Sequence, residues 1–211
     1  VILVTTAVLI VLPALFFFFV DFCALPMGNR LLASLFQSVT PRTAGFNTVT
    51  LSAMTGVSQA VLIFLMMVGG SPGSTAGGMK TTTLAVLVAN VASTFRQRDS
   101  LQFFGRRVDC NAIKTAATIL TMYLALFFGG AVFISMYEDI PLSLCLYETA
   151  SAVGTVGLTL GITPQLHIPS QIVLIALMYL GRVGGLTLVY ATFSSRKVGN
   201  AKLPQEKITI G

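Results

Sequence analysis

The sequence is poor in charged residues. Only 9% of its 211 residues are charged, whereas 55% are hydrophobic, and a soluble domain carries about 25% charged residues. This deficit excludes an ordinary soluble domain and predicts a chain embedded in a lipid bilayer. The formal net charge of +6 comes largely from basic clusters at 96–114 and 196–207, which flank apolar segments. The positive-inside rule explains both clusters and places them in the cytoplasm, so no nucleic-acid partner is expected.

Cysteine and histidine are also scarce. Cys23, Cys110 and Cys145 are isolated and show no CxxC spacing, so neither a disulfide framework nor a zinc site is indicated. The single histidine, His167, has no partner ligands around it, and no transition-metal site is expected. No nucleophile, acid/base pair or metal cluster stands out. The sequence therefore predicts a protein that is not an enzyme and that has no cofactor in this chain.

The chain also lacks an initiator methionine and a charged leader. Val1 lies directly inside an apolar run, which is a poor match to a signal peptide. We expect this chain to be part of a longer one.

Apolar segments of membrane length alternate with shorter ones. The segments 1–20, 112–136 and 168–193 predict membrane helices, and 58–68 and 84–95 predict the two halves of a helix that is broken between them. The segments 30–40, with Asn29 as N-cap, and 142–153 predict short helices. These two are too short for the ~20 residues of a crossing, so they are predicted to be re-entrant.

The order of these segments repeats. The predicted fold is an all-α membrane protein with two repeats of membrane helix, re-entrant pore helix, filter loop and membrane helix. The first repeat covers 1–95 and has the broken helix, 96–111 is a cytoplasmic connection, 112–195 is the second repeat and 196–211 is a cytoplasmic tail. An offset of 112 residues aligns Thr43 with Thr155 and Gly45 with Gly157. Acidic turns place the loop side outward.

A glycine-centred loop follows each short helix. The loops are Thr43, Ala44, Gly45 and Phe46 in the first repeat, and Thr155, Val156, Gly157 and Leu158 in the second. Backbone carbonyls can replace the water of a cation such as K⁺, glycine permits unusual backbone angles, and the short helices direct their negative ends toward the ion. Two loops form half of a four-fold ring, so a second copy or missing N-terminal pore repeats must supply the rest. The alternative is a pair of ordinary glycine turns.

The break in the first repeat is rich in glycine. It consists of Gly69, Gly70, Ser71, Pro72, Gly73, Ser74, Thr75, Ala76, Gly77 and Gly78. Irregular backbone at this depth must be buried in protein or line a water-filled cavity. Residues 73–81 nearly match a phosphate-binding loop, but Met79 separates Gly78 from Lys80 and no strand precedes the segment. Close helix packing through Gly-x-x-x-Gly spacing remains a further alternative.

Arg182 stands alone in the last apolar segment. A charge in the middle of a membrane helix costs at least ~2.5 kcal/mol, so Arg182 should face protein or water. An ion pair with Glu148 is one way to satisfy it.

Several of these motifs resemble one family. FQSVTPRTAGFNT at 36–48, GGSPGSTAGGMKT at 69–81, SAVGTVGLT at 151–159 and GRVGGLT at 181–187 resemble the last two of four pore repeats in the Trk/Ktr/HKT potassium transporters. The ending LPQEKITIG resembles the bacterial KtrB branch. The resemblance implies that 69–78 gates the pore below the filter and that Arg182 forms an electrostatic barrier to cations. It also implies K⁺ uptake across the plasma (inner) membrane, Na⁺ coupling or nucleotide regulation, a homodimer, and a cytoplasmic nucleotide-binding regulatory subunit.

A second hypothesis belongs to another class. Glycine-mediated helix packing would also suit a non-conducting membrane scaffold or assembly module.

Overall fold

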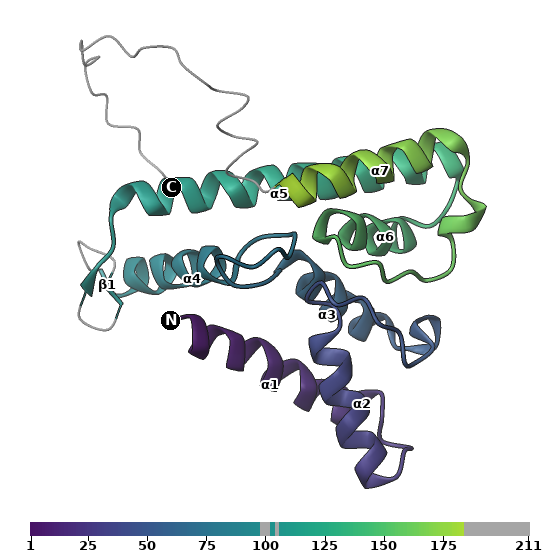
Figure 1. Cartoon of the computed structure of the whole chain (residues 1–211), viewed down its shortest axis with the longest axis horizontal. Coiled ribbons are helices and arrows are strands. Elements are labelled where there is room, and N and C mark those ends of the chain that lie inside the picture. Colours follow the sequence, from purple (N-terminus) through teal and green to yellow (C-terminus); the bar gives the residue numbers. More distant parts are fainter. Residues whose placement is uncertain (98–101, 104–105, 184–211) are drawn as a thin grey trace.

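Seven α-helices make up most of the structure, a computed structural model that describes residues 1–97, 102–103 and 106–183 (Figure 1). In chain order they are α1 Ile2–Val20, α2 Met27–Val39, α3 Gly56–Met67, α4 Thr81–Phe95, α5 Cys110–Glu138, α6 Leu142–Gly154 and α7 Ile168–Val183. Short 3-10 turns, Leu51–Ala53 and Thr163–Gln165, precede α3 and α7. The predicted all-α fold is confirmed, and the two-residue strands β1 Gln102–Phe103 and β2 Arg106–Arg107 pair within the polar connection.

Two of the described helices are long and apolar enough to cross a bilayer. They are α1, with 19 residues, and the 28 residues 111–138 of α5. The helix α1 continues through Pro13 and leaves most of its apolar side chains exposed, as a helix surrounded by lipid or by further helices does. The helices α3, α4 and α7 are shorter and apolar. The last predicted membrane helix is described as far as Val183, and its remainder lies outside the described residues.

The short helices α2 and α6 have 13 residues each. Each begins directly after a proline, Pro26 or Pro141, because proline suits the start of a helix, where a backbone N–H has no partner. The prediction that Asn29 caps the first short helix is wrong, since Asn29 lies inside α2. Neither helix runs the length of α5, beside which α6 lies in Figure 1.

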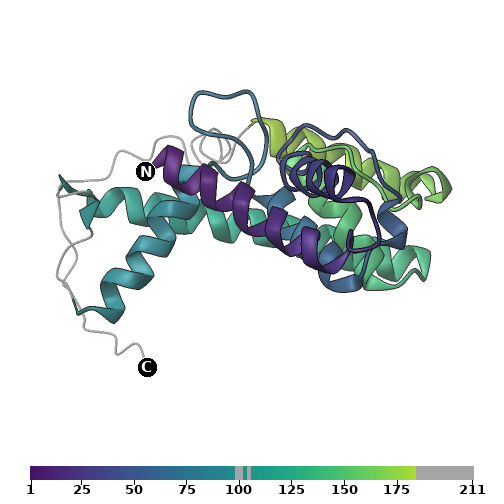
Figure 2. The same ribbon diagram turned by 90° about the horizontal axis from the view of Figure 1, so that it is seen from below.

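The two short helices have different surroundings. The helix α6 packs against α3, α5 and α7, and nine of its residues are buried. The helix α2 packs against α1, which itself crosses α4 (Figure 2). The buried residues of α2 are polar, namely Ser34, Gln37 and Ser38, while Leu31, Leu32, Leu35 and Phe36 are exposed. The helix α6 is therefore largely buried among other helices, whereas α2 is open on its apolar side.

The spacing between corresponding elements narrows along the chain, and the ends of α1 and α5 are 118 residues apart. The starts of α2 and α6, Met27 and Leu142, are 115 residues apart, whereas the starts of α3 and α7 are 112 apart. The difference arises after the short helices. Thr155 directly follows α6, but Thr43 lies four residues beyond the end of α2. A turn at 40–42 thus lengthens the first loop on the helix side.

Candidate ion filter and gate

The two glycine-centred loops, 112 residues apart in the chain, lie against each other. A β-carbon on Gly45 would sit 2.0 Å from the Val156 carbonyl oxygen. Only glycine allows this approach, because any side chain at position 45 would force the two loops apart. The structure thus brings together the two segments that the sequence analysis singled out.

The loops share an unusual backbone pattern. Thr43 and Gly45 have φ angles of 68° and 74°, and Thr155 and Gly157 have φ angles of 53° and 92°. A left-handed conformation costs a residue with a β-carbon roughly 1–2 kcal/mol, so a threonine in this region in both loops marks strained backbone. Such strain concentrates at functional sites, where the surrounding structure holds it in place.

A hydroxyl residue at the end of each short helix anchors the loop that follows. The carbonyl of Thr40 accepts hydrogen bonds from Ala44 N and Gly45 N, and its hydroxyl donates to the Phe46 carbonyl over 2.6 Å. In the second loop, the Ser151 carbonyl accepts from Val156 N, and its hydroxyl accepts from Gly157 N over 3.1 Å. Sequence reasoning missed both anchors, because a Ser or Thr near the end of a helix can bond to several nearby backbone groups.

Glu148 braces the segment beyond the second loop. The residue is 4% exposed. Its carboxylate accepts hydrogen bonds from the Thr159 hydroxyl at 2.6 Å, the Leu160 N–H at 3.0 Å and the Thr163 hydroxyl at 2.7 Å. These donors satisfy a charge that would otherwise be costly to bury. Among the described residues Glu148 forms no ion pair with Arg182, so that alternative is not supported.

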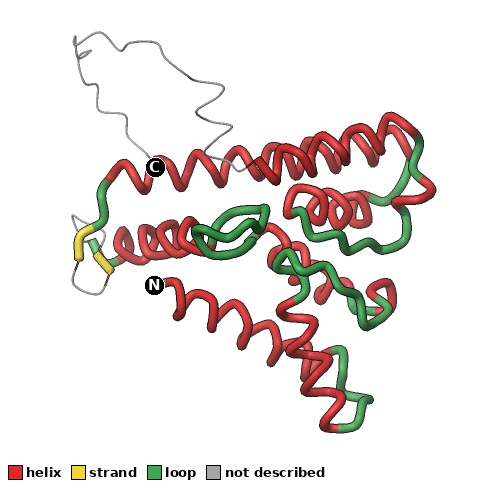
Figure 3. Tube along the Cα trace, viewed as in Figure 1, coloured by secondary structure: helices red, strands yellow, loops and turns green. Residues whose placement is uncertain are grey.

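The glycine-rich break is a closed loop rather than a helix (Figure 3). Gly69 N donates to Met79 O at 2.8 Å and Met79 N donates to Met67 O at 3.0 Å, which joins the two ends of the loop. A β-carbon on Gly69 would lie 1.8 Å from the Gly77 carbonyl oxygen, whereas Gly73 has open space and a φ of 84°. Helix packing through Gly-x-x-x-Gly spacing therefore does not describe this segment.

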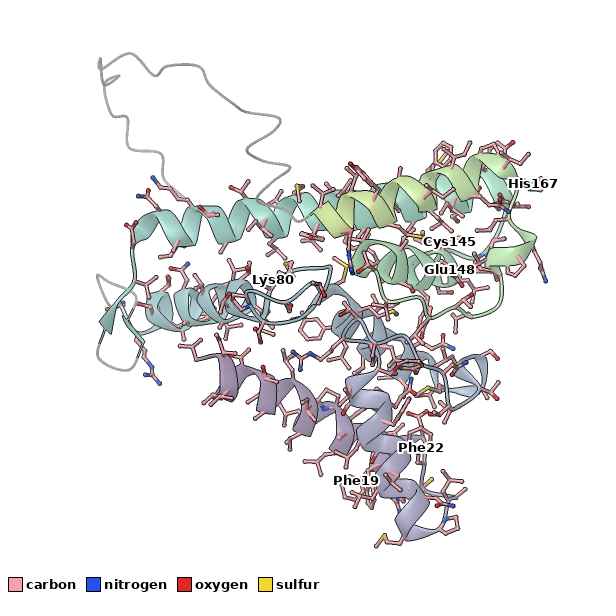
Figure 4. All side chains as sticks on the ribbon, in the orientation of Figure 1. Phe19, Phe22, Lys80, Cys145, Glu148 and His167 are labelled. Atoms are coloured by element: carbon pink, nitrogen blue, oxygen red, sulfur yellow. The ribbon has the colours of Figure 1, made fainter. Side chains whose placement is uncertain are left out.

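The side chain of Lys80 holds this loop together. Its Nζ donates to the Ser74 carbonyl at 3.1 Å and to the Ala76 carbonyl at 2.6 Å, and Figure 4 labels it where the loop meets α4. A phosphate-binding loop instead presents backbone N–H groups to its ligand. The carbonyls that face Lys80 therefore argue against the nucleotide alternative.

Close backbone contacts seat the end of α6 on three other segments. A β-carbon on Gly77 would lie 2.2 Å from the Thr155 hydroxyl, and one on Gly154 would lie 2.3 Å from Met66 O. One on Gly181 would lie 2.0 Å from the Val153 carbonyl oxygen. The glycine-rich loop, α3 and α7 thus meet where the second glycine-centred loop begins.

Arg182 lies beside this junction. It is exposed in this chain, and it lines a cleft of about 500 Å³ together with Thr155, Gly157 and Met178. Arg182 is also close enough to Lys80 for the two charges to repel each other. Two cationic side chains therefore gather near the second loop, one of them tied to the glycine-rich loop.

Facing loops at the ends of two short helices, next to a broken helix, define a class of protein. Irregular backbone of this kind is tolerated at membrane depth only inside protein or along a water-filled path, so the class is a multi-helix membrane protein built around such a path. The chain belongs to the TrkH family, described as cation transport protein, whose family model matches residues 1–203.

Curated relatives and a solved structure agree with this assignment. The chain is 39% identical over 189 residues to the potassium/sodium uptake protein NtpJ of Enterococcus hirae, which covers 87% of this chain and 42% of that protein. It is 34% identical over 183 residues to the Ktr system potassium uptake protein B of Bacillus subtilis, covering 87% and 41%. The crystal structure of the potassium transporter TrkH from Vibrio parahaemolyticus matches 90% of this chain and 43% of that one, with a TM-score of 0.76 and 21% identity.

The chain spans about two fifths of the length of these relatives. Their names describe ion transporters, and the prediction that this chain is not an enzyme is confirmed. The family resemblance drawn from the sequence motifs is confirmed as well.

Proposed function

We propose that this chain forms half of the wall of a pathway for K⁺, or for monovalent cations more broadly, across the plasma membrane. The observation that carries the proposal is the contact of Gly45 with the Val156 carbonyl, between two loops with the same left-handed pattern. The carbonyls of Thr43 to Phe46 and Thr155 to Leu158 are the proposed ion ligands, since carbonyl oxygens can replace a hydration shell. The Phe46 carbonyl is shared with Thr40, which fixes its direction.

In our proposal, segments outside this chain supply the other half of the filter ring. The apolar side of α2 is open, and Leu32 on it is 70% exposed, whereas α6 is covered by α3 of the neighbouring unit. A helix equivalent to α3 would cover α2 in the same way. Further pore repeats in a longer chain, or a second copy of this chain, would provide that helix.

The gate in this proposal is the loop 69–78 with Arg182. Lys80 holds the loop closed through hydrogen bonds to two of the loop carbonyls. Gly77 contacts Thr155, the first residue of the second filter loop. Arg182 adds a positive charge at the same level. A cation that leaves the filter would therefore meet both a steric and an electrostatic barrier.

The family resemblance supplies the remaining parts of the proposal. We propose a homodimer of full-length subunits with the filter side outward and the basic connection and tail in the cytoplasm. A cytoplasmic nucleotide-binding subunit would regulate the gate, and Na⁺ is the proposed coupling ion. The names of the relatives, which refer to potassium and potassium/sodium uptake, agree with this choice of ions.

The test uses the full-length protein that contains this segment. It should restore growth at low K⁺ to a host without K⁺ uptake, and Gly45→Ser or Gly157→Ser should weaken the preference for K⁺ over Na⁺ in flux measurements. Growth that stays K⁺-limited although the protein reaches the membrane would favour the scaffold hypothesis. Unchanged selectivity in both glycine variants would reject the filter assignment.

A further inference from the structure

An acidic residue at the end of each long helix holds the start of the following inner helix. In the first clasp, Asp21 Oδ1 accepts from Thr55 N at 3.2 Å and Asp21 Oδ2 accepts from the Ser58 hydroxyl. In the second clasp, Glu138 Oε1 accepts from His167 N at 2.9 Å. Thr55 is the N-cap of α3 and His167 directly precedes α7. Each carboxylate thus satisfies a free backbone N–H and the positive end of a helix dipole.

The two clasps occupy corresponding places in the two units. Thr55 and His167 are 112 residues apart, which is the interval between Gly45 and Gly157. Both clasps tie a long helix, α1 or α5, to the inner helix that follows the filter loop. His167 lies at the end of the molecule opposite the β1–β2 connection (Figure 4). The clasps therefore frame the loops on the side that our proposed function places outside the cell.

The second clasp differs from the first because its partner can titrate. His167 Nδ1 lies 2.7 Å from Glu138 Oε2, and the side chains are 73% and 3% exposed, respectively. The carboxylate is thus buried while the imidazole is open to solvent protons. Histidine changes charge between about pH 5 and 8, and a protonated imidazole forms a stronger, charge-assisted bond with a carboxylate than a neutral one does.

Few other ionisable groups surround this pair. On α5, the Tyr137 ring meets the His167 ring edge to face at 6.2 Å, and Asp139 is the next residue along the chain. On α6, Cys145 is near enough to sense the charges of Glu138 and Glu148. Tyrosine and cysteine are neutral and aspartate is charged over the range in which histidine titrates. Among the described residues around the clasp, His167 is thus the side chain of the type that changes charge in that range.

We propose that Glu138 and His167 are positioning residues that make transport depend on external pH. Protonated His167 holds α7 firmly to α5, which keeps Gly181 packed against Val153 and the second loop in the arrangement that binds the ion. As the external pH rises and His167 loses its proton, the clasp weakens and apparent K⁺ affinity falls. The proposal rests on the proposed function, because it assumes that these loops bind the transported ion.

The test measures K⁺ uptake by the reconstituted full-length protein with the external pH set between 5.5 and 8. The concentration of K⁺ at half-maximal uptake should rise about twofold to fivefold across this range, because an ion pair with one solvent-exposed partner is a modest interaction. His167→Thr gives the second clasp the residue of the first and keeps an N-cap side chain. This variant should transport K⁺ with a markedly flatter pH profile.

Two further variants make the test specific. Thr55→His places an imidazole beside Asp21 and should add pH dependence, and Glu138→Gln should flatten the profile as His167→Thr does. A wild-type profile retained by His167→Thr, or a flat profile in the wild-type protein, would overturn the clasp proposal. Absence of K⁺ uptake at every pH would instead count against the proposed function, so the two failures are distinguishable.

Discussion

The Lys80 ammonium lies 2.6 Å from the carbonyl oxygen of Ala76, inside the loop that the lysine itself terminates. Together with its bond to Ser74 O, this contact holds the glycine-rich loop in one shape. A positive charge at the start of a helix interacts unfavourably with the helix dipole. The hydrogen bonds to the loop carbonyls, rather than the helix, therefore account for a lysine at this position.

Removing this ammonium should loosen the proposed gate. Lys80→Met keeps most of the side-chain length but loses both bonds to the loop, and we expect severalfold faster basal K⁺ flux into proteoliposomes. Lys114→Met is the matched control, because Lys114 is exposed on α5 and should leave the flux unchanged. Equal flux in both variants would show that Lys80 does not restrain the loop.

Arg182 should act through its charge. Arg182→Ala removes a cation beside the second loop and is expected to increase K⁺ flux, whereas Arg182→Lys should keep it close to that of the wild type. The measurement is the rate of K⁺ uptake per folded protein, with folding checked by size-exclusion chromatography. Unchanged flux in a folded Arg182→Ala protein would remove the electrostatic barrier from the mechanism.

The brace at Glu148 should stabilise the second loop. Glu148→Gln weakens three hydrogen bonds, and the loss of a charged acceptor is expected to lower the free energy of unfolding by about 1–3 kcal/mol. Thr159→Val should weaken the same network, while Thr118→Val is the control, since the Thr118 hydroxyl bonds only within α5. Thermal unfolding in detergent gives the comparison, and equal midpoints for the two valine variants would contradict the brace.

The two loop glycines should differ in their tolerance of alanine. A β-carbon at Gly157 would meet no neighbouring atom, and the left-handed φ is the obstacle to a side chain there. Gly157→Ala should therefore lower the free energy of unfolding by roughly 1–2 kcal/mol. Gly45→Ala adds a clash with the Val156 backbone and should be more destabilising and abolish selective K⁺ uptake. Gly129→Ala, inside α5 and free of neighbours, should be neutral or stabilising by up to ~1 kcal/mol. Similar effects at Gly45 and Gly157 would mean that the contact between the loops is unimportant.

The sequence predicted the helices well because apolar runs and prolines mark them directly. The second short helix was predicted at 142–153 and is found at Leu142–Gly154, and the broken helix was recognised from its glycines. The offset of 112 holds for the loops and for the helices that follow them, but not for the short helices, because a turn at 40–42 leaves no periodic signal. The sequence offset also identified the two loops, but it did not predict that they contact each other.

The hydrogen bonds that hold the loops were not predictable in the same way. Thr40, Ser151 and Lys80 bond to backbone groups whose directions depend on how the loop folds. A hydroxyl or an ammonium in the sequence does not reveal which carbonyl it will reach. Glu148 was noticed as a possible partner of Arg182, yet its neighbours along the chain after the loop satisfy it.

The unequal surroundings of α2 and α6 have a consequence for assembly. The helices α3, α5 and α7, which pack against α6 within the described residues, all belong to this chain, and α7 is the last of the three in the sequence. The leucine side of α2 has no such cover within the described residues, and its Ser34, Gln37 and Ser38 already face inward. The packing of α2 therefore depends on a segment beyond the described residues, such as the further pore repeat or second copy that our proposal invokes.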